Sequence, residues 1–196
     1  MTRQSWSMLS FALLLAGCAS EPPTRIYVLS PPVDDRPSGS TLAGATVLQI
    51  RPVVLPDYLD TTDILLRIGT NEIKASPTGR WGERLSQGLD HALAAALVVR
   101  LPRDRVELAA ASDRSARWVL VTVEAFDVQP DGHSVLKASW RILDPKPDAT
   151  PLTGSGVFAT PAATGPIGDA AIVAAMSQVI GLLADRIAAD MEGARS

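Results

Sequence analysis

Few side chains in this sequence are suited to covalent or acid–base chemistry. Among 196 residues there is one cysteine, Cys18, and there are two histidines, His91 and His133. A single thiol cannot form an internal disulfide or the multi-cysteine site that holds structural zinc. Two separated imidazoles also give little material for general-base catalysis or metal binding. The first question is therefore what the one thiol does.

Cys18 ends a segment that has the features of a bacterial lipoprotein signal. Arg3 lies in a short polar start, residues 8–15 are mostly apolar, and the motif Leu-Ala-Gly-Cys occupies positions 15–18. The apolar run has the length of a signal-peptide core and is too short to span a bilayer. The motif resembles a lipobox. The alternative, an N-terminal helix with a buried cysteine, does not explain this order of charge, apolar run, small residues and thiol.

The lipobox resemblance implies a lipid anchor. Residues 1–17 would be the removed signal peptide, and the Cys18 thiol would carry a diacylglycerol. Two or three acyl chains hold a protein on a membrane essentially permanently without spanning it. Ala19 and Ser20 follow the cysteine, and the resemblance associates inner-membrane retention with an aspartate there. We therefore expect an anchor in the outer membrane, on its periplasmic face.

The histidines are not in patterns that indicate catalysis. His91 falls on the polar side of a predicted helix, and His133 follows Gly132 in a predicted turn. An anchored hydrolase would need a serine, an aspartate and one of these imidazoles to converge. We expect both histidines to be solvated and the protein not to be an enzyme.

Two further motifs resemble ligand sites only superficially. Asp57, Asp60 and Asp63 recur at intervals of three, but no calcium loop with its glycine and closing glutamate surrounds them. Gly154-Ser155-Gly156 is followed by neither a third glycine nor the lysine of a phosphate loop. We therefore predict no metal site and no cofactor, and a strand for the glycine-rich segment.

Composition and charge agree with a globular domain that does not bind nucleic acid. Hydrophobic residues make up 46% and charged residues 20% of the chain, and the net charge is −3 with both signs scattered. Phosphate backbones require a basic footprint, which this chain lacks. One compact domain is the expectation for this length.

The chain divides into a tether and one α+β domain. Residues 18–43 are rich in proline, serine and glycine and predict a flexible lipidated tether with a short strand at 25–29. Residues 44–196 form the domain, with a mixed or antiparallel sheet and two main helices packed on it. The predicted helices cover 80–99, with Trp81 on the apolar stripe, and 169–191. Further strands are predicted at 46–51, 64–68, 72–75, 105–108, 117–128, 136–142 and 154–160.

Several segments in register resemble the family of ABC-type transport auxiliary lipoproteins, the PqiC type. They are Ile-Tyr-Val-Leu at 26–29, Leu-Pro-Asp-Tyr-Leu-Asp at 55–60, Ile-Leu-Leu-Arg at 64–67, Trp-Gly-Glu-Arg-Leu at 81–85 and Ala-Ser-Trp-Arg at 138–141. The resemblance covers nearly the whole mature chain. Thr61 and Thr62 depart from it where arginine and proline are expected, and Arg84 departs where proline is common.

The resemblance implies a role beside an MCE-domain system that moves lipids between the two membranes. The lipoprotein would be the outer-membrane docking piece for the periplasmic MCE tube, assembled as a homo-oligomeric ring. Tyr58, Leu59 and Asp60 are the candidate partner-binding residues, although core packing is an open alternative for them. The alternative function is another outer-membrane lipoprotein role, as a lipopolysaccharide assembly factor or a secretion pilot.

Overall fold

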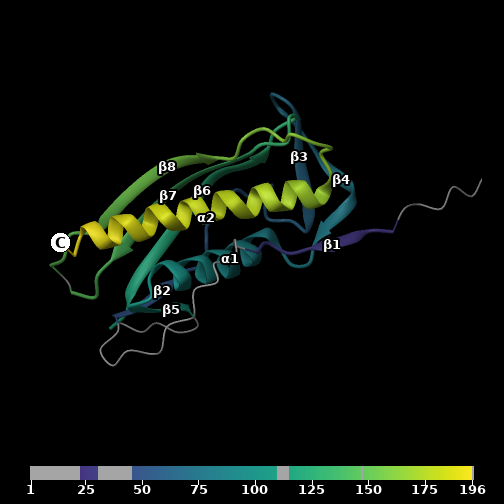
Figure 1. Cartoon of the computed structure of the whole chain (residues 1–196). Coiled ribbons are helices and arrows are strands. Elements are labelled where there is room, and N and C mark those ends of the chain that lie inside the picture. Colours follow the sequence, from purple (N-terminus) through teal and green to yellow (C-terminus); the bar gives the residue numbers. More distant parts are fainter. Residues whose placement is uncertain (1–22, 31–45, 110–114, 147, 196) are drawn as a thin grey trace, which may run out of the picture.

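The protein is an α+β domain with two sheets and two helices (Figure 1). A computed structural model describes residues 23–30, 46–109, 115–146 and 148–195. The larger sheet has the order β5-β2-β6-β7-β8 and the smaller one β1-β4-β3. The predicted fold class is confirmed, while Cys18 and most of the predicted tether lie outside the described residues. The strands are β1 Arg25–Tyr27, β2 Thr46–Ile50, β3 Asp63–Gly69, β4 Glu72–Trp81, β5 Asp104–Leu108, β6 Arg117–Val128, β7 Ser134–Leu143 and β8 Leu152–Ala159.

The long hairpin of β6 and β7 is the centre of the larger sheet. Its turn contains Gly132 at a φ of 82°, a left-handed conformation that glycine adopts without strain. In β7, Leu136, Ala138, Trp140 and Ile142 are buried and alternate with more exposed residues. This period of two gives β7 one face in the core, and the predicted antiparallel pairing with β6 is confirmed.

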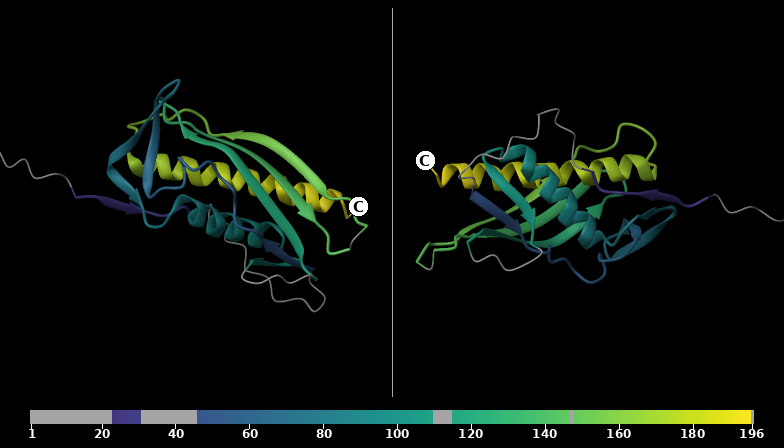
Figure 2. Two further views of the ribbon diagram at one scale, coloured as in Figure 1. Left: turned by 180° about the vertical axis from the view of Figure 1, so that it is seen from behind. Right: turned by 90° about the horizontal axis from the view of Figure 1, so that it is seen from below.

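One face of the larger sheet is covered by the two helices, α1 Leu85–Arg100 and α2 Asp169–Gly193 (Figures 1 and 2). The helices also contact each other. By length and composition α2 could cross a membrane, but its apolar stripe packs against the sheet. All six stripe residues predicted from the spacing are buried: Ile172, Met176, Val179, Ile180, Leu183 and Ile187. α2 is therefore a core helix.

The smaller sheet joins sequence segments that are far apart. β1 pairs in parallel with the end of β4, with Arg25 opposite Gly79 and Tyr27 opposite Trp81. Leu29, just after β1, is buried in the common core. β1 and the C-terminus lie at opposite ends of the molecule in every view (Figures 1 and 2).

The predicted start of the first helix was wrong. The predicted helix was to start at residue 80, but β4 continues to Trp81, and α1 begins at Leu85. The strand is extended because it pairs with β1 on one side and β3 on the other, and the Trp81 backbone N–H also donates to Thr62 O at 2.7 Å. Trp81 is buried as predicted, but it reaches the core from a strand.

Candidate functional site

The histidines lie apart, and each contacts one carboxylate. His91 on α1 places Nδ1 3.1 Å from Glu83 Oε1, and its side chain is 58% exposed. His133 contacts Asp131 within the β6–β7 turn, and this hydrogen bond is the main reason that the pKa of Asp131 lies below its ordinary value. The part of the chain that the structure describes contains no cluster of three or more metal-ligating side chains.

The glycine-rich segment 154–156 is part of strand β8, as predicted. Gly154 lies directly against the indole of Trp140. A Cβ at position 154 would stand only 2.5 Å from Trp140 Cε2. The indole Nε1 in turn donates a hydrogen bond of 3.1 Å to Asp190 Oδ2 on α2. Glycine is needed here to admit a tryptophan side chain, and the motif has a packing role.

The three candidate partner-binding residues lie in one tight loop but face different surroundings. The loop is closed by hydrogen bonds from the N–H groups of Leu59 to Pro56 O at 2.9 Å and of Asp60 to Asp57 O at 3.2 Å. Tyr58 is 46% exposed, whereas Leu59 is 2% exposed and belongs to the core. Leu59 therefore holds the loop from inside, and Tyr58 presents an aromatic surface to solvent.

Asp60 stabilises the start of α1 from outside the helix. Its Oδ1 accepts the backbone N–H of Ser86 at 3.2 Å, and its Oδ2 lies 3.0 Å from Arg84 Nε. Arg84, the N-cap residue, makes no side-chain cap of its own. Hydrogen bonds from Ser86 are the largest cause of the lowered pKa of Asp60. A carboxylate at a helix N-terminus is favourable because it pairs with free N–H groups and with the helix dipole.

Tyr58 lies beside an ion pair that joins the two sheets. Arg67 Nη2 on β3 lies 2.9 Å from Asp127 Oδ1 on β6, and both side chains are largely buried. The pKa of Tyr58 is raised, first by burial and then by the charge of Asp127, against a lowering effect of Arg67. The phenol is therefore neutral at physiological pH. It can contact a partner through its ring and donate one hydrogen bond.

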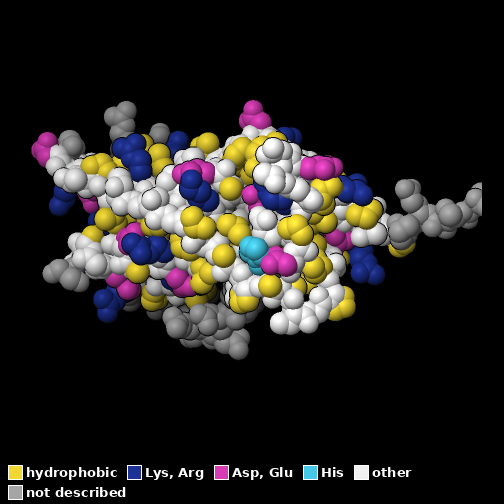
Figure 3. Space-filling view, turned by 90° about the horizontal axis from the view of Figure 1, so that it is seen from above, with side chains coloured by type: hydrophobic (Ala, Val, Ile, Leu, Met, Phe, Trp, Pro, Cys, Tyr) yellow, Lys and Arg dark blue, Asp and Glu magenta, His cyan; other side chains and the backbone are white. Residues whose placement is uncertain are grey.

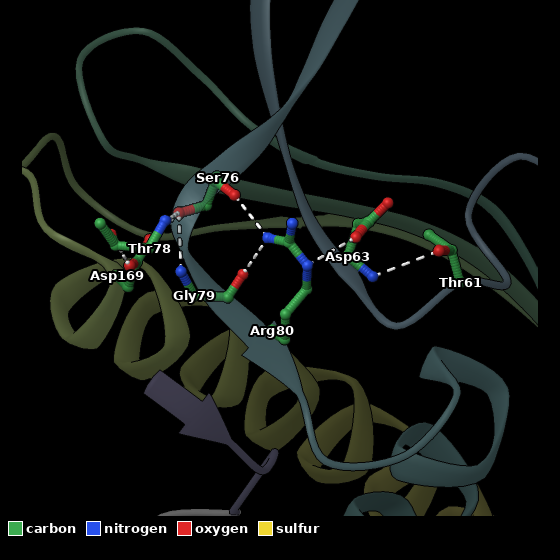
Figure 4. A network of polar contacts seen from close by, with 7 residues as sticks. All are labelled: Thr61, Asp63, Ser76, Thr78, Gly79, Arg80 and Asp169. Atoms are coloured by element: carbon green, nitrogen blue, oxygen red, sulfur yellow. Dashed lines mark hydrogen bonds and ion pairs between the residues drawn. The ribbon is translucent and has the colours of Figure 1, made fainter. Parts of the chain in front are cut away.

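A second polar group, which the sequence patterns did not reveal, joins α2 to β4 (Figure 4). Asp169 accepts hydrogen bonds of 2.6 Å from both Ser76 Oγ and Thr78 Oγ1. Gly79 donates its N–H to Ser76 Oγ at 3.1 Å, and a Cβ on Gly79 would stand 2.7 Å from Asp169 Cγ. Arg80 continues the network to Asp63 at 2.9 Å.

This network braces the start of α2 against β4. Both carboxylate oxygens of Asp169 accept hydroxyl groups of β4 and so hold the first turn of α2 against that strand. In the sequence, this network is indicated only by the acidic Asp169 at the predicted start of the last helix. An acidic residue is common at any helix N-terminus, so Asp169 alone does not predict the contacts with β4.

The face of the molecule shown in Figure 3 carries no patch in which all charged side chains have the same sign. Lysine and arginine side chains alternate there with aspartate and glutamate, and hydrophobic side chains lie among them. This mixture gives no basic footprint for a polyanion on that face. An exposed aromatic residue such as Tyr58 is the kind of residue that protein interfaces favour.

Comparisons with known proteins give one matching family model and solved structures that share the fold. The family model described as "ABC-type transport auxiliary lipoprotein component" matches residues 27–188. None of the curated proteins matches the chain. The crystal structure of an uncharacterized protein is similar with a TM-score of 0.71 and 18% identity, covering 86% of this chain and 99% of that one. A Xanthomonas campestris protein of the DUF330 family has a TM-score of 0.67 and 16% identity, covering 88% and 98%.

Proposed function

The chain belongs to the family of ABC-type transport auxiliary lipoprotein components, and on that basis we propose that it docks an MCE-type lipid transport system at the outer membrane. The observation that carries the proposal is the family match over residues 27–188, which covers the folded domain and begins soon after the lipobox-like motif at 15–18. The lipoprotein would hold the end of the periplasmic MCE-domain tube against the outer membrane, which receives or supplies the lipid.

The anchor in this proposal is Cys18. Residues 1–17 would be removed as a signal peptide, residues 18–43 would form the lipidated tether, and residues 44–196 would form the docking domain. The absence of an aspartate after the cysteine supports the outer membrane as the site of anchoring. Acylation through several chains gives a lasting attachment without a membrane-spanning segment.

The docking role also requires no chemistry from the domain, and we propose that it is not an enzyme. The ionisable side chains of the three polar groups described above hold elements together: Asp60 at α1, Asp169 at α2 and Arg67 with Asp127 between the sheets. Tyr58 is the residue of the loop 56–60 that we propose to contact the partner, because it is exposed while Leu59 is buried.

Self-association is part of the same proposal. A ring of identical subunits needs two different complementary faces on each copy, and such heterologous contacts close when the rotation between neighbours allows it. Mass photometry of the purified full-length lipoprotein in detergent tests this, because a ring gives one dominant multiple of the subunit mass. A persistent single subunit over a wide concentration range would argue against it.

Affinity capture of the acylated protein from detergent-solubilised envelopes, followed by mass spectrometry, tests the docking role. We expect an MCE-domain protein among the captured partners, with its recovery reduced for Tyr58→Ala and unchanged for a substitution of exposed Glu72 on the β3–β4 turn. Cys18→Ala controls for the membrane anchor. Reproducible recovery of only lipopolysaccharide-assembly or secretion components would replace this proposal with another lipoprotein role.

A further inference from the structure

Only a short stretch of chain separates the proposed anchor from the domain. β1 begins at Arg25, seven residues after Cys18. A fully extended chain spans at most about 3.6 Å per residue, so β1 must begin within about 25 Å of the anchored thiol. The 25 residues of α2 extend for about 37 Å. The end of the molecule that carries β1 is thus held near the membrane, and the C-terminal end of α2 lies at the other end (Figures 1 and 2).

The β1 segment exposes two large aliphatic side chains at this end. Ile26 is 66% exposed and Val28 is 57% exposed, whereas Tyr27 between them packs against the core. The two side chains flank the turn at Gly82, where a Cβ would lie 3.3 Å from Ile26 Cγ2 and 3.4 Å from Val28 Cγ1. Ile26 and Val28 therefore form one small apolar surface over Gly82, whereas Arg25 alternates to the other face of β1 with Tyr27.

Most charged side chains around this surface are paired within the protein, among them Glu83, which lines the same small hollow as Val28 and lies 3.1 Å from His91 Nδ1. Arg80 pairs with Asp63 at 2.9 Å and Arg84 pairs with Asp60 at 3.0 Å. Arg25 is exposed, and no described residue forms an ion pair with it. Exposed aliphatic side chains with a long, flexible arginine at their edge suit the headgroup layer of a bilayer, where the arginine can extend to phosphate.

We propose that Arg25, Ile26 and Val28, here called the β1 patch, rest on the lipid surface in which Cys18 is anchored. Ile26 and Val28 enter the headgroup layer, and the C-terminal end of α2 points away from the membrane. The inference rests on the proposed function, since it requires the acylated cysteine. It goes further by assigning the end of the domain that carries β1 to lipid.

The single cysteine allows a direct test in the full-length lipoprotein. Once Cys18 carries the diacylglycerol as a thioether, a cysteine introduced by Ile26→Cys is the only free thiol and can be labelled with an environment-sensitive fluorophore. Thr153→Cys gives the matched control, because Thr153 is exposed on β8 next to Gly154. Thr153 lies toward the C-terminal end of α2, because Trp140, which packs on the neighbouring Gly154, donates a hydrogen bond to Asp190 near the end of that helix. Both labelled proteins are reconstituted in phosphatidylethanolamine–phosphatidylglycerol vesicles with and without doxyl-labelled phosphatidylcholine.

We expect doxyl lipid to quench the label at position 26 severalfold more than the label at position 153, with a blue-shifted emission only at position 26. Equal quenching at both positions, or none at position 26, would overturn the proposal. The intact mass is measured on the same samples. A mass without diacylglycerol on Cys18 refutes the anchor of the proposed function and this inference together, whereas an acylated protein with an unquenched label at position 26 refutes this inference alone.

Discussion

Replacing Asp60 tests whether this residue stabilises the fold or binds a partner. In Asp60→Ala, the N–H of Ser86 loses its side-chain acceptor and Arg84 loses its carboxylate. Loss of a helix cap costs about 1 to 2 kcal/mol. The pair with Arg84, whose side chain is 61% exposed, adds little, because exposed ion pairs contribute about 0.5 kcal/mol or less. We therefore expect the free energy of unfolding to fall by roughly 1 to 2 kcal/mol.

Asp60→Asn separates the hydrogen bond from the charge. The amide oxygen of asparagine can still accept the Ser86 N–H, so the cap is retained. What is lost is the ion pair and the favourable interaction of a carboxylate with the helix dipole, about 0.3 to 1 kcal/mol. The expected order of stability is therefore wild type, then Asp60→Asn, then Asp60→Ala. Urea unfolding of the mature protein, followed by far-UV circular dichroism, measures all three.

The pH dependence provides an independent check with a definite sign. The folded-state pKa of Asp60 is lowered, chiefly by hydrogen bonds from Ser86. A carboxyl group with a lowered pKa contributes stability that is fully present above its unfolded pKa, about 3.9, and is lost as pH falls through the folded pKa. The stability difference between wild type and Asp60→Asn should therefore be constant near neutral pH and shrink below about pH 4.

Two results would refute this reasoning. If Asp60→Ala unfolds at the same urea concentration as wild type, the carboxylate does not cap α1 in solution. If the variant is stable but captures less of the MCE-domain partner, Asp60 contacts the partner directly. Capture at wild-type level by Asp60→Asn, with reduced stability, would assign Asp60 to the fold alone.

Four further substitutions test the roles assigned above. Tyr58→Ala should change the free energy of unfolding by less than about 0.5 kcal/mol and yet lower partner capture. Leu59→Ala should lower the free energy of unfolding by about 2 to 5 kcal/mol. Similar urea midpoints for the two variants would contradict the burial of Leu59. Gly154→Ala should cost about 1 to 3 kcal/mol because its methyl group displaces the Trp140 indole, and near-UV circular dichroism should show the moved tryptophan. Asp169→Ala leaves two hydroxyl donors without their acceptor and should cost about 2 to 4 kcal/mol, with faster amide exchange confined to the first turn of α2.

Local periodicity predicted the parts of the fold in which one element faces one core. β7 alternates with a period of two along its whole length, and α2 repeats its apolar residues at three and four. Both patterns depend only on neighbours along the chain, so burial followed from them directly. β6 followed instead from an apolar run typical of a central strand, and the turn at Gly132 from the Pro-Asp-Gly residues at 130–132.

Long-range pairing explains where prediction failed. Trp81 lies four residues before Leu85 and eight before Leu89, a spacing that fits a helix stripe by coincidence. What keeps residues 78–81 extended is β1, more than fifty residues earlier, together with β3. The separation of the strands into two sheets has the same origin. Neither partner can be identified from the sequence around Trp81, so the local pattern favoured a helix.

The departures from the family pattern have a physical explanation in the same region. The resemblance predicts an arginine after Asp60 and a proline after Glu83, and this chain has Thr61 and Arg84 there. Arg84 lies across the contact and pairs with Asp60, so a cation is present in the loop–helix junction although its position in the sequence differs. Thr61 contributes its backbone carbonyl, which accepts the N–H of Leu85 at 3.2 Å. The N–H groups of Leu85 and Ser86 are thus accepted by the loop 60–61, so α1 begins here without a proline at position 84.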